Sequence, residues 1–119
     1  MKDVFVVDDN VDTLFIVDTI LSSDGYKVKC FANWKDLYNQ LDIFIPSLIL
    51  MDVYLGQADG RDIARQLNNS FITQNIPIIL FSSDNFLASS ESGKILSKPF
   101  KPEKLLNIVH QFIGDATDN

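Results

Sequence analysis

Short apolar runs alternate with helix-like stretches along the whole chain, and this alternation strongly constrains the fold. Five runs have the pattern of strands: four apolar ones at residues 4–7, 48–51, 78–81 and 95–96, and a weaker one at 28–31, which includes Lys29. Runs that are apolar at every position are typical of strands buried on both faces. Parallel strands need crossover connections, and right-handed crossovers place helices on both faces of one sheet. The sequence therefore predicts a doubly wound α/β fold around a five-stranded parallel sheet.

Apolar residues spaced three or four positions apart predict the helices between these strands. The four stripes are Val11, Leu14, Val17 and Leu21; Trp34, Leu37, Tyr38 and Leu41; Ile63, Ala64, Leu67 and Phe71; and Leu105, Ile108, Val109 and Phe112. Asn33 is a suitable N-cap for the second helix, and Pro102 fits the first turn of the last one. Residues 82–93 show little periodicity, so any helix there is short. The tail at 114–119 is expected to fray.

Length and composition indicate one globular domain covering residues 1–119. Hydrophobic residues make up 46% of the 119 residues and charged residues 22%. The net charge of −6 argues against direct binding to nucleic acid or to an anionic membrane surface. With no signal-peptide pattern and no apolar stretch that could span a bilayer, we predict a cytoplasmic location. Cys30 is the only cysteine, which excludes an internal disulfide and indicates a small packed side chain.

Polar residues follow the predicted strands at the point where each strand ends. Asp8 and Asp9 follow the first strand, Asp52 the third, Ser82 the fourth and Lys98 the fifth. In open parallel sheets, chemistry gathers outside the carboxyl ends of the strands, so these side chains are expected to meet at one edge. A role in capping is the simpler alternative for Asp9 or Asn10, at the start of the first helix.

Three carboxylates at one edge repel each other unless a cation lies among them. An all-oxygen set of ligands suits Mg²⁺ better than Zn²⁺, which prefers His or Cys. Such an ion also neutralises charge on a phosphoryl group, and Lys98 and the Ser82 hydroxyl could bind phosphoryl oxygens. A carboxylate placed between them can act as a nucleophile.

These residues resemble the receiver domain of two-component response regulators, a flavodoxin-like (βα)5 module typified by the chemotaxis receiver. The resemblance covers nearly the whole chain. Its motifs are the acidic pair in Val6-Val7-Asp8-Asp9-Asn10, the aspartate in Leu50-Met51-Asp52, Asp59-Gly60, the hydroxyl residue that closes the run 77–82, and Lys98-Pro99-Phe100. Together, in this order and spacing, they are highly specific.

The resemblance implies a role for each of these positions. Asp52 would be the phosphoacceptor, Ser82 the switch hydroxyl and Lys98 the phosphate partner. The Mg²⁺ ligands would be Asp8, Asp9, Asp52 and the backbone carbonyl of Tyr54. The donor would be a phosphohistidine on a histidine kinase or a histidine phosphotransfer protein, and the output a changed surface read by a downstream protein. The chain would be a signalling domain that catalyses only its own phosphoryl transfer and dephosphorylation.

Three departures from the family pattern affect the expected output. Gly56 replaces the usual proline after the acceptor, which is expected to loosen that loop. Ile95 replaces the usual aromatic residue three positions before the lysine, so the usual aromatic readout is not expected. The segment from Ser82 to Lys98 is shorter than the family norm by roughly one and a half helical turns, which predicts a shortened or missing fourth helix.

Two other classes of protein share parts of this pattern. A Mg²⁺-dependent phosphohydrolase could use Asp8 as nucleophile, but such enzymes want a second aspartate where this chain has Asn10. A flavin-binding module of similar topology would need a phosphate-binding loop after the first strand, where Asp8 and Asp9 would repel the phosphate. Tyr54 is a candidate shield for an acyl phosphate, or alternatively an exposed loop aromatic. His110, on the last helix, is expected to be partly solvated.

Overall fold

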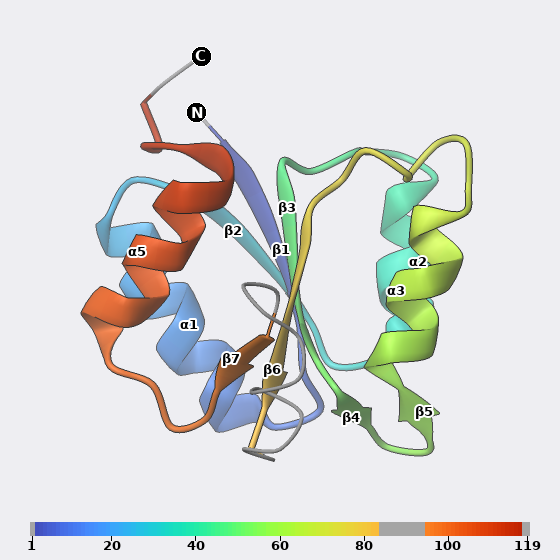
Figure 1. The fold of residues 1–119 in the computed structure, drawn as a ribbon, viewed down its shortest axis with the longest axis horizontal. Coiled ribbons are helices and arrows are strands. Elements are labelled where there is room, and N and C mark those ends of the chain that lie inside the picture. The colour runs from blue at the N-terminus through green and yellow to red at the C-terminus, as the bar shows by residue number, and fades with distance from the viewer. Residues whose placement is uncertain (1, 84–94, 118–119) are drawn as a thin grey trace.

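A five-stranded parallel sheet lies between two pairs of helices in a computed structural model that describes residues 2–83 and 95–117 (Figure 1). The sheet order is β2-β1-β3-β6-β7. Its strands are β1 (Asp3–Val7), β2 (Lys27–Phe31), β3 (Leu48–Asp52), β6 (Ile78–Ser82) and β7 (Ile95–Ser97). Every neighbouring pair in this sheet is parallel. The predicted doubly wound five-stranded fold is therefore confirmed.

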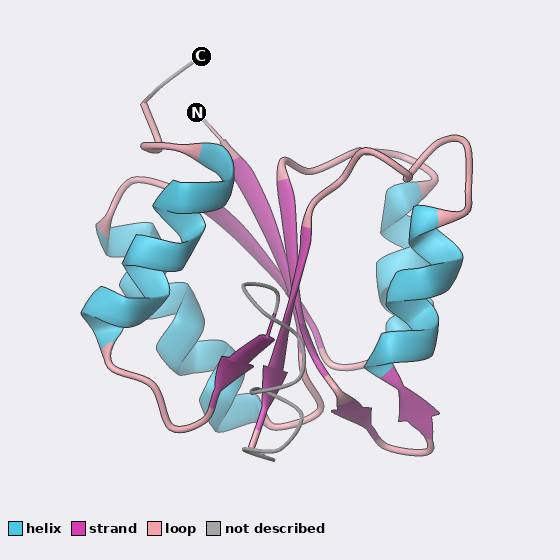
Figure 2. Ribbon diagram, viewed as in Figure 1, coloured by secondary structure: helices cyan, strands magenta, loops and turns pink. Residues whose placement is uncertain are grey.

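The four described helices cover both faces of the sheet, as Figure 2 shows in cyan. They are α1 (Val11–Ser23), α2 (Trp34–Leu41), α3 (Gly60–Asn68) and α5 (Pro102–Ile113). Helices α1 and α5 lie on one face, and α2 and α3 on the other (Figure 1). The expected shortening or loss of the fourth helix falls on residues 84–94, which lie outside the described residues.

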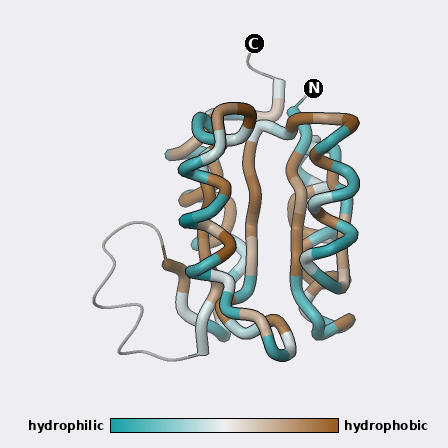
Figure 3. The backbone as a smooth tube through the Cα atoms, turned by 90° about the vertical axis from the view of Figure 1, so that its right-hand side faces the viewer, coloured by the Kyte–Doolittle hydropathy of each residue, from teal (hydrophilic) through white to brown (hydrophobic). Residues whose placement is uncertain are grey.

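The sheet is apolar on both sides, so each helix pair encloses its own core. Figure 3 shows hydrophobic colour running along the central strands, and hydrophobic and hydrophilic colours alternating along the helices. Alternate residues of β1 belong to the two cores. Phe5 and Val7 face α2 and α3, and Val4 and Val6 face α1 and α5. All four are at most 2% exposed, which explains why their run carries no polar residue.

Capping residues set the helix ends at positions that the sequence indicates. The Asn10 side chain accepts hydrogen bonds from the amides of Asp12 and Thr13 at the start of α1, and Asn33 accepts one from Asp36 at the start of α2. Helix α1 ends at Asp24-Gly25, where Gly25 has a φ of +98° that favours glycine.

Several predicted positions differ from the structure. Val11 is 71% exposed because it opens α1 at the rim of the sheet, and Phe71 is 88% exposed because α3 ends three residues earlier, at Asn68. Trp34 and Tyr38 are only partly buried and pack against the edge of the core. The segment after Asp52 forms a small antiparallel hairpin, β4 (Tyr54–Leu55) with β5 (Ala58–Asp59), instead of a plain loop.

The first part of the tail packs onto the body of the domain instead of fraying. Ala116 is 1% exposed and belongs to the core beneath α1 and α5. The Tyr26 hydroxyl donates a hydrogen bond of 2.5 Å to the Gly114 carbonyl. This apolar and polar anchoring is why the expected fraying does not hold at Gly114 to Ala116.

Candidate functional site

Three carboxyl groups meet at the carboxyl ends of β1 and β3. The register pairs Val7 with Met51, so Asp8 and Asp52 follow on neighbouring strands. One carboxylate oxygen from each of Asp8, Asp9 and Asp52 lies within 4.8 Å of the others. Asp8 is fully buried and Asp52 nearly so, whereas Asp9 is exposed. The convergence that the strand order predicts therefore occurs, and we call these three residues the acid cluster.

The Lys98 ammonium binds to two members of the acid cluster. Its Nζ lies 2.7 Å from Asp8 Oδ2 and 3.1 Å from Asp52 Oδ1. The Lys98 backbone amide donates to the Ser82 carbonyl at 2.8 Å, so the end of β6 fixes where the lysine leaves the sheet. Burial alone would lower the pKa of Lys98, but its hydrogen bonds and charge interactions with Asp8 and Asp52 outweigh burial and raise that pKa. The lysine therefore stays charged.

The charge on Asp52 is costly in this environment. Burial raises the pKa of the Asp52 carboxyl, and the neighbouring charge on Asp8 raises it further. The hydrogen bond and charge of Lys98 act in the opposite direction without cancelling these effects. A perturbed carboxyl group with a specific cationic partner at a strand end is a candidate functional residue.

Backbone amides hold the two carboxylates that follow β1. Asp8 Oδ1 accepts a hydrogen bond of 2.9 Å from the Asn10 amide. Asp9 Oδ2 accepts one of 3.1 Å from the Gly56 amide, at the tip of the β4–β5 hairpin. Gly56 has a φ of +62°, so its turn is of the kind that favours glycine. Gly56 was expected to loosen this loop, but its amide connects the hairpin to Asp9.

Ser82 and Ile95 occupy buried positions on β6 and β7, the two strands that continue the sheet from β3 to its edge. Ser82 is fully buried, and it follows Phe81, the register partner of Asp52. Its own partner on β7 is Ser97. Ile95 is 8% exposed and pairs with Leu80. The residue that replaces the family's usual aromatic side chain is therefore an aliphatic member of the core.

Gly60 packs against the backbone of Asp52, a role that the motif Asp59-Gly60 did not indicate. A Cβ atom at this position would lie 2.2 Å from the Asp52 carbonyl oxygen, so only glycine fits there. The Gly60 amide donates to the Val53 carbonyl at 2.7 Å. Asp59 caps α3 through the Arg61 amide at 2.8 Å and pairs with the Arg61 guanidinium. The sequence signal that could have indicated this role is a glycine directly after an aspartate that caps a helix.

The remaining candidates lie outside the acid cluster. The Tyr54 side chain is 52% exposed, on the strand that follows Asp52. His110 is exposed and lies 2.7 Å from Asp24, on α5. Burial raises the pKa of the half-buried Cys30 thiol to about 11, in keeping with a packed, unreactive side chain. The described part of the chain has no helix that is long and apolar enough to cross a membrane.

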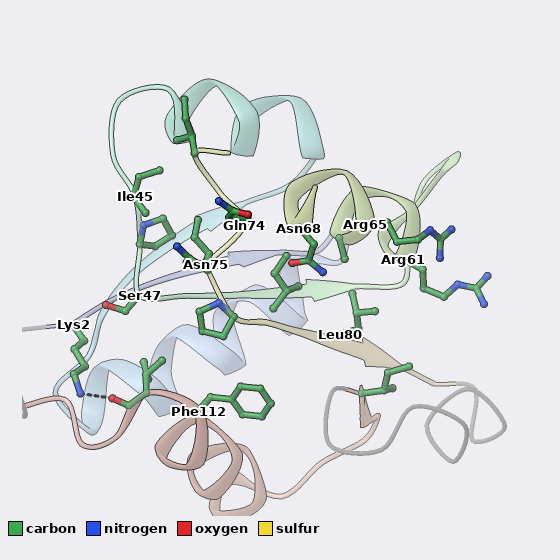
Figure 4. Close-up of a pocket in the computed structure, with 18 residues that line it drawn as sticks. Lys2, Ile45, Ser47, Arg61, Arg65, Asn68, Gln74, Asn75, Leu80 and Phe112 are labelled. Atoms are coloured by element: carbon green, nitrogen blue, oxygen red, sulfur yellow. Dashed lines mark hydrogen bonds between the residues drawn. The ribbon is translucent and has the colours of Figure 1, made fainter. Parts of the chain in front are cut away.

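A cavity of about 910 Å³ lies elsewhere, beside α3 and β6 (Figure 4). Its described lining includes Arg61, Arg65, Leu80 and Phe112, and none of the three clustered aspartates. The acid cluster is thus not part of this cavity.

The donor set of the acid cluster fits Mg²⁺. It consists of carboxylate oxygens close enough to share one ion, and it includes neither His nor Cys. Lys98 already neutralises part of the charge from the side of β7, while exposed Asp9 leaves the cluster open to solvent. A small hard cation that keeps several of its waters suits such an open oxygen site.

Comparison with known proteins gives matches over nearly the whole chain. The family described as the response regulator receiver domain matches residues 4–110. A probable transcriptional regulator, ycf27, of Cyanophora paradoxa is 29% identical over 110 residues, which cover 87% of this chain and 45% of that protein. The chain spans about half the length of the first curated relatives it matches.

Solved structures agree with the fold. The receiver domain of sensor histidine kinase PA1611 from Pseudomonas aeruginosa PAO1, which holds a magnesium ion in its active-site cleft, has a TM-score of 0.84 at 24% identity, over 96% of this chain and 98% of that one. The BeF3-activated receiver domain of DrrB is 30% identical, with a TM-score of 0.77 over 94% and 97% of the two chains. From the family match over residues 4–110, the chain belongs to the response regulator receiver domain family of two-component signalling systems.

Proposed function

We propose that Asp52 accepts a phosphoryl group from a phosphohistidine on a histidine kinase or phosphotransfer protein. The observation that carries this proposal is the position of Asp52: the carboxylate ends a central strand, among two further carboxylates, with Lys98 Nζ at 3.1 Å. An oxygen of the Asp52 carboxylate forms a bond to phosphorus as the phosphorus–nitrogen bond to the imidazole breaks. The imidazole nitrogen keeps the electron pair and takes a proton.

Asp8, Asp9 and Asp52 would hold Mg²⁺, with the Tyr54 backbone carbonyl as a further ligand. When bound, the ion supplies positive charge that stabilises the oxygens of the phosphoryl group. Lys98 keeps its charge and would bind a phosphoryl oxygen once Asp52 carries the acyl phosphate. The Ser82 hydroxyl is proposed to hydrogen-bond another oxygen, and Tyr54 to shield the acyl phosphate from water. The domain would thus catalyse only its own phosphoryl transfer and dephosphorylation.

An apolar face of α1 suits the approach of the donor. Val11 and Phe15 lie one helical turn apart, with exposed fractions of 71% and 72%, and Ile16 is 51% exposed. Helix α1 begins directly after Asp8, Asp9 and Asn10, so these side chains lie beside the acceptor edge. We propose that the donor protein packs here. A cytoplasmic location and a single domain spanning 1–119 stay predictions.

The test is an intact-mass measurement after incubation with Mg²⁺ and a small acyl phosphate. A labile adduct of one phosphoryl group is expected on the wild type and on Asp62→Asn, a control that changes an exposed carboxylate of α3, and not on Asp52→Asn. An adduct that persists in Asp52→Asn would refute the assignment.

The same incubation separates the alternative classes of protein. Release of free phosphate that survives Asp52→Asn but not Asp8→Asn would favour a phosphohydrolase. A yellow protein with a flavin absorption spectrum would favour the flavin-binding module. The receiver predicts neither.

A further inference from the structure

The end of the molecule opposite the acid cluster exposes five large apolar side chains. They belong to the loop before β3 and the loop before β6, at the amino ends of these strands (Figure 1). Their exposed fractions are 80% for Ile43, 42% for Phe44, 44% for Ile45, 88% for Phe71 and 70% for Ile72. We call these five residues the apolar loop end.

The two loops lie side by side. Ile45 and Ser47 from the first loop, and Ile72, Gln74 and Asn75 from the second, line the same cavity (Figure 4). Ile45 and Ile72 therefore face one cavity, and Ile43, Phe44 and Phe71 are their neighbours in sequence on the same two loops. Monomeric proteins rarely expose contiguous apolar patches beyond a few hundred Å², and larger ones mark interaction sites.

The exposure of Phe71 and Ile72 is built into a hydrogen-bonded loop. The Thr73 hydroxyl is buried and donates to the Leu67 carbonyl at 2.6 Å. The Thr73 amide donates to Ser70, and the Ile76 amide donates to the Thr73 carbonyl, at 3.2 and 3.1 Å. These bonds fix the loop with Phe71 and Ile72 facing outward, so their exposure is a property of the fold.

This end is also unusually free of charge for an acidic protein. The chain has a net charge of −6, yet residues 43–51 and 66–83 contain no Asp, Glu, Lys or Arg. Among the described residues, the charged ones that line the shared cavity are Lys2, Arg61 and Arg65. Within the two loops, the neighbours of the apolar residues are mainly amides and hydroxyls, and Asp42 stands at the start of the first loop. These polar residues are Ser47, Asn69, Ser70, Gln74 and Asn75. Depletion of charged residues around a core of aromatic and aliphatic side chains is the composition of a protein–protein interface.

We infer that the apolar loop end is the interface of a symmetric homodimer. We expect its occupant to be mainly apolar, because the loop residues 43–47 and 69–77 carry no charged side chain that could attract an oppositely charged partner. A second copy presents a surface with those properties, and two-fold symmetry brings like patches together. Two copies with a charge of −6 each repel through their acidic surfaces, and contact at this end keeps those surfaces apart.

The size of the surface is sufficient for such a contact. A phenylalanine side chain buries on the order of 150–250 Å², so Phe71 alone offers roughly 130–220 Å². With four further apolar residues and the polar border, the patch approaches the roughly 800 Å² per partner of a standard interface. The acid cluster lies at the opposite ends of the strands, so both acceptor sites stay accessible. The dimer should therefore form with or without phosphoryl transfer.

Sedimentation velocity of the full chain over a wide range of micromolar concentrations tests this inference. We expect a monomer–dimer equilibrium that added salt leaves intact or tightens, because screening weakens the repulsion between the acidic copies. Phe71→Asp and, on the other loop, Ile43→Asp should each weaken the dimer at least about tenfold. Both side chains are largely exposed, so thermal unfolding of the variants should match the wild type at concentrations where the wild type is monomeric.

The matched control is Phe15→Asp, which places the same charge on another exposed phenylalanine, on α1. It should leave the dimer intact. A wild type that stays monomeric at the highest concentration would overturn the inference, as would a dimer that survives Phe71→Asp but dissociates with Phe15→Asp. Dissociation by salt would indicate an ionic contact elsewhere, and growth beyond a dimer would exclude the symmetric interface. Acyl phosphate and Mg²⁺ should not change the association, so this result is independent of the acceptor role of Asp52.

Discussion

Replacing Asp52 by asparagine should make the metal-free domain more stable at neutral pH. The substitution keeps the shape of the side chain and removes one of three charges that lie within 4.8 Å of each other. Burial and the charge of Asp8 raise the pKa of the Asp52 carboxyl, which means that the folded state favours its neutral form. Asparagine supplies that neutral form permanently.

The distances in the site set the size of the effect. At an effective dielectric constant of about 20, like charges 4.8 Å apart repel by about 3.5 kcal/mol, so Asp8 and Asp9 together disfavour the Asp52 charge by about 7 kcal/mol. Attraction to Lys98 at 3.1 Å offsets about 5 kcal/mol. Because Asp9 is exposed and screened, we expect a net increase in the free energy of unfolding of about 1–2 kcal/mol.

Urea unfolding in the presence of a chelator measures this difference as a function of pH. Since the pKa of Asp52 is raised in the folded state, the stability from its protonated form is present at low pH and is lost as pH rises through that raised pKa. The advantage of Asp52→Asn should therefore be full at pH 7 and shrink as the pH falls. Saturating Mg²⁺ should also reduce it, because the ion binds better to the wild type.

Asp59→Asn is the matched control, since the same chemical change should have the opposite sign. The hydrogen bond from Arg61 lowers the pKa of Asp59, so its charged form stabilises the fold above its ordinary pKa, and this contribution is lost as pH falls through the lowered value. Asp59→Asn should destabilise the domain at pH 7. If Asp52→Asn is instead the less stable protein at pH 7 without metal, the electrostatic account of the acid cluster is wrong.

Three further substitutions test the support of the site. Gly60→Ala places a Cβ 2.2 Å from the Asp52 carbonyl oxygen, and urea unfolding should show a loss of about 1–3 kcal/mol. Gly56→Pro removes the amide that donates to Asp9, and calorimetric titration should show weaker Mg²⁺ binding than in Gly56→Ala, which is also strained at a φ of +62° but keeps the amide; equal affinities would exclude this role. Lys98→Ala should keep Mg²⁺ binding but reduce the amide NMR shift changes caused by acyl phosphate; an unchanged response would remove Lys98 from the mechanism.

The strands and the acid cluster could be predicted because the relevant signals are local. A run such as residues 48–51 is apolar at every position only when both faces are buried, and a parallel sheet then brings the residues after its strands to one edge. Asp8, Asp52 and Lys98 were found by this rule alone. The family resemblance added roles for them, and these remain proposals.

The parts that could not be predicted depend on contacts distant in sequence. The Gly56 amide donates a hydrogen bond to Asp9, which is 47 positions away in the sequence. The presence of a glycine in the sequence does not show where its amide points. The stripe that includes Phe71 continues three residues beyond the end of α3, because apolar spacing does not report where a helix stops. Ala116 packs in the core although it stands in a polar tail.

The ammonium of Lys98 reaches its carboxylates from the far end of the chain, 90 residues after Asp8. During synthesis, the polypeptide therefore releases Asp8, Asp9 and Asp52 long before the lysine that offsets their mutual repulsion. A nascent chain that stops short of β7 carries an uncompensated cluster of anions at the edge of its central strands. Completion of the acid cluster with its lysine and completion of the sheet thus coincide, and a product truncated before β7 should lack the cation that offsets the three carboxylates.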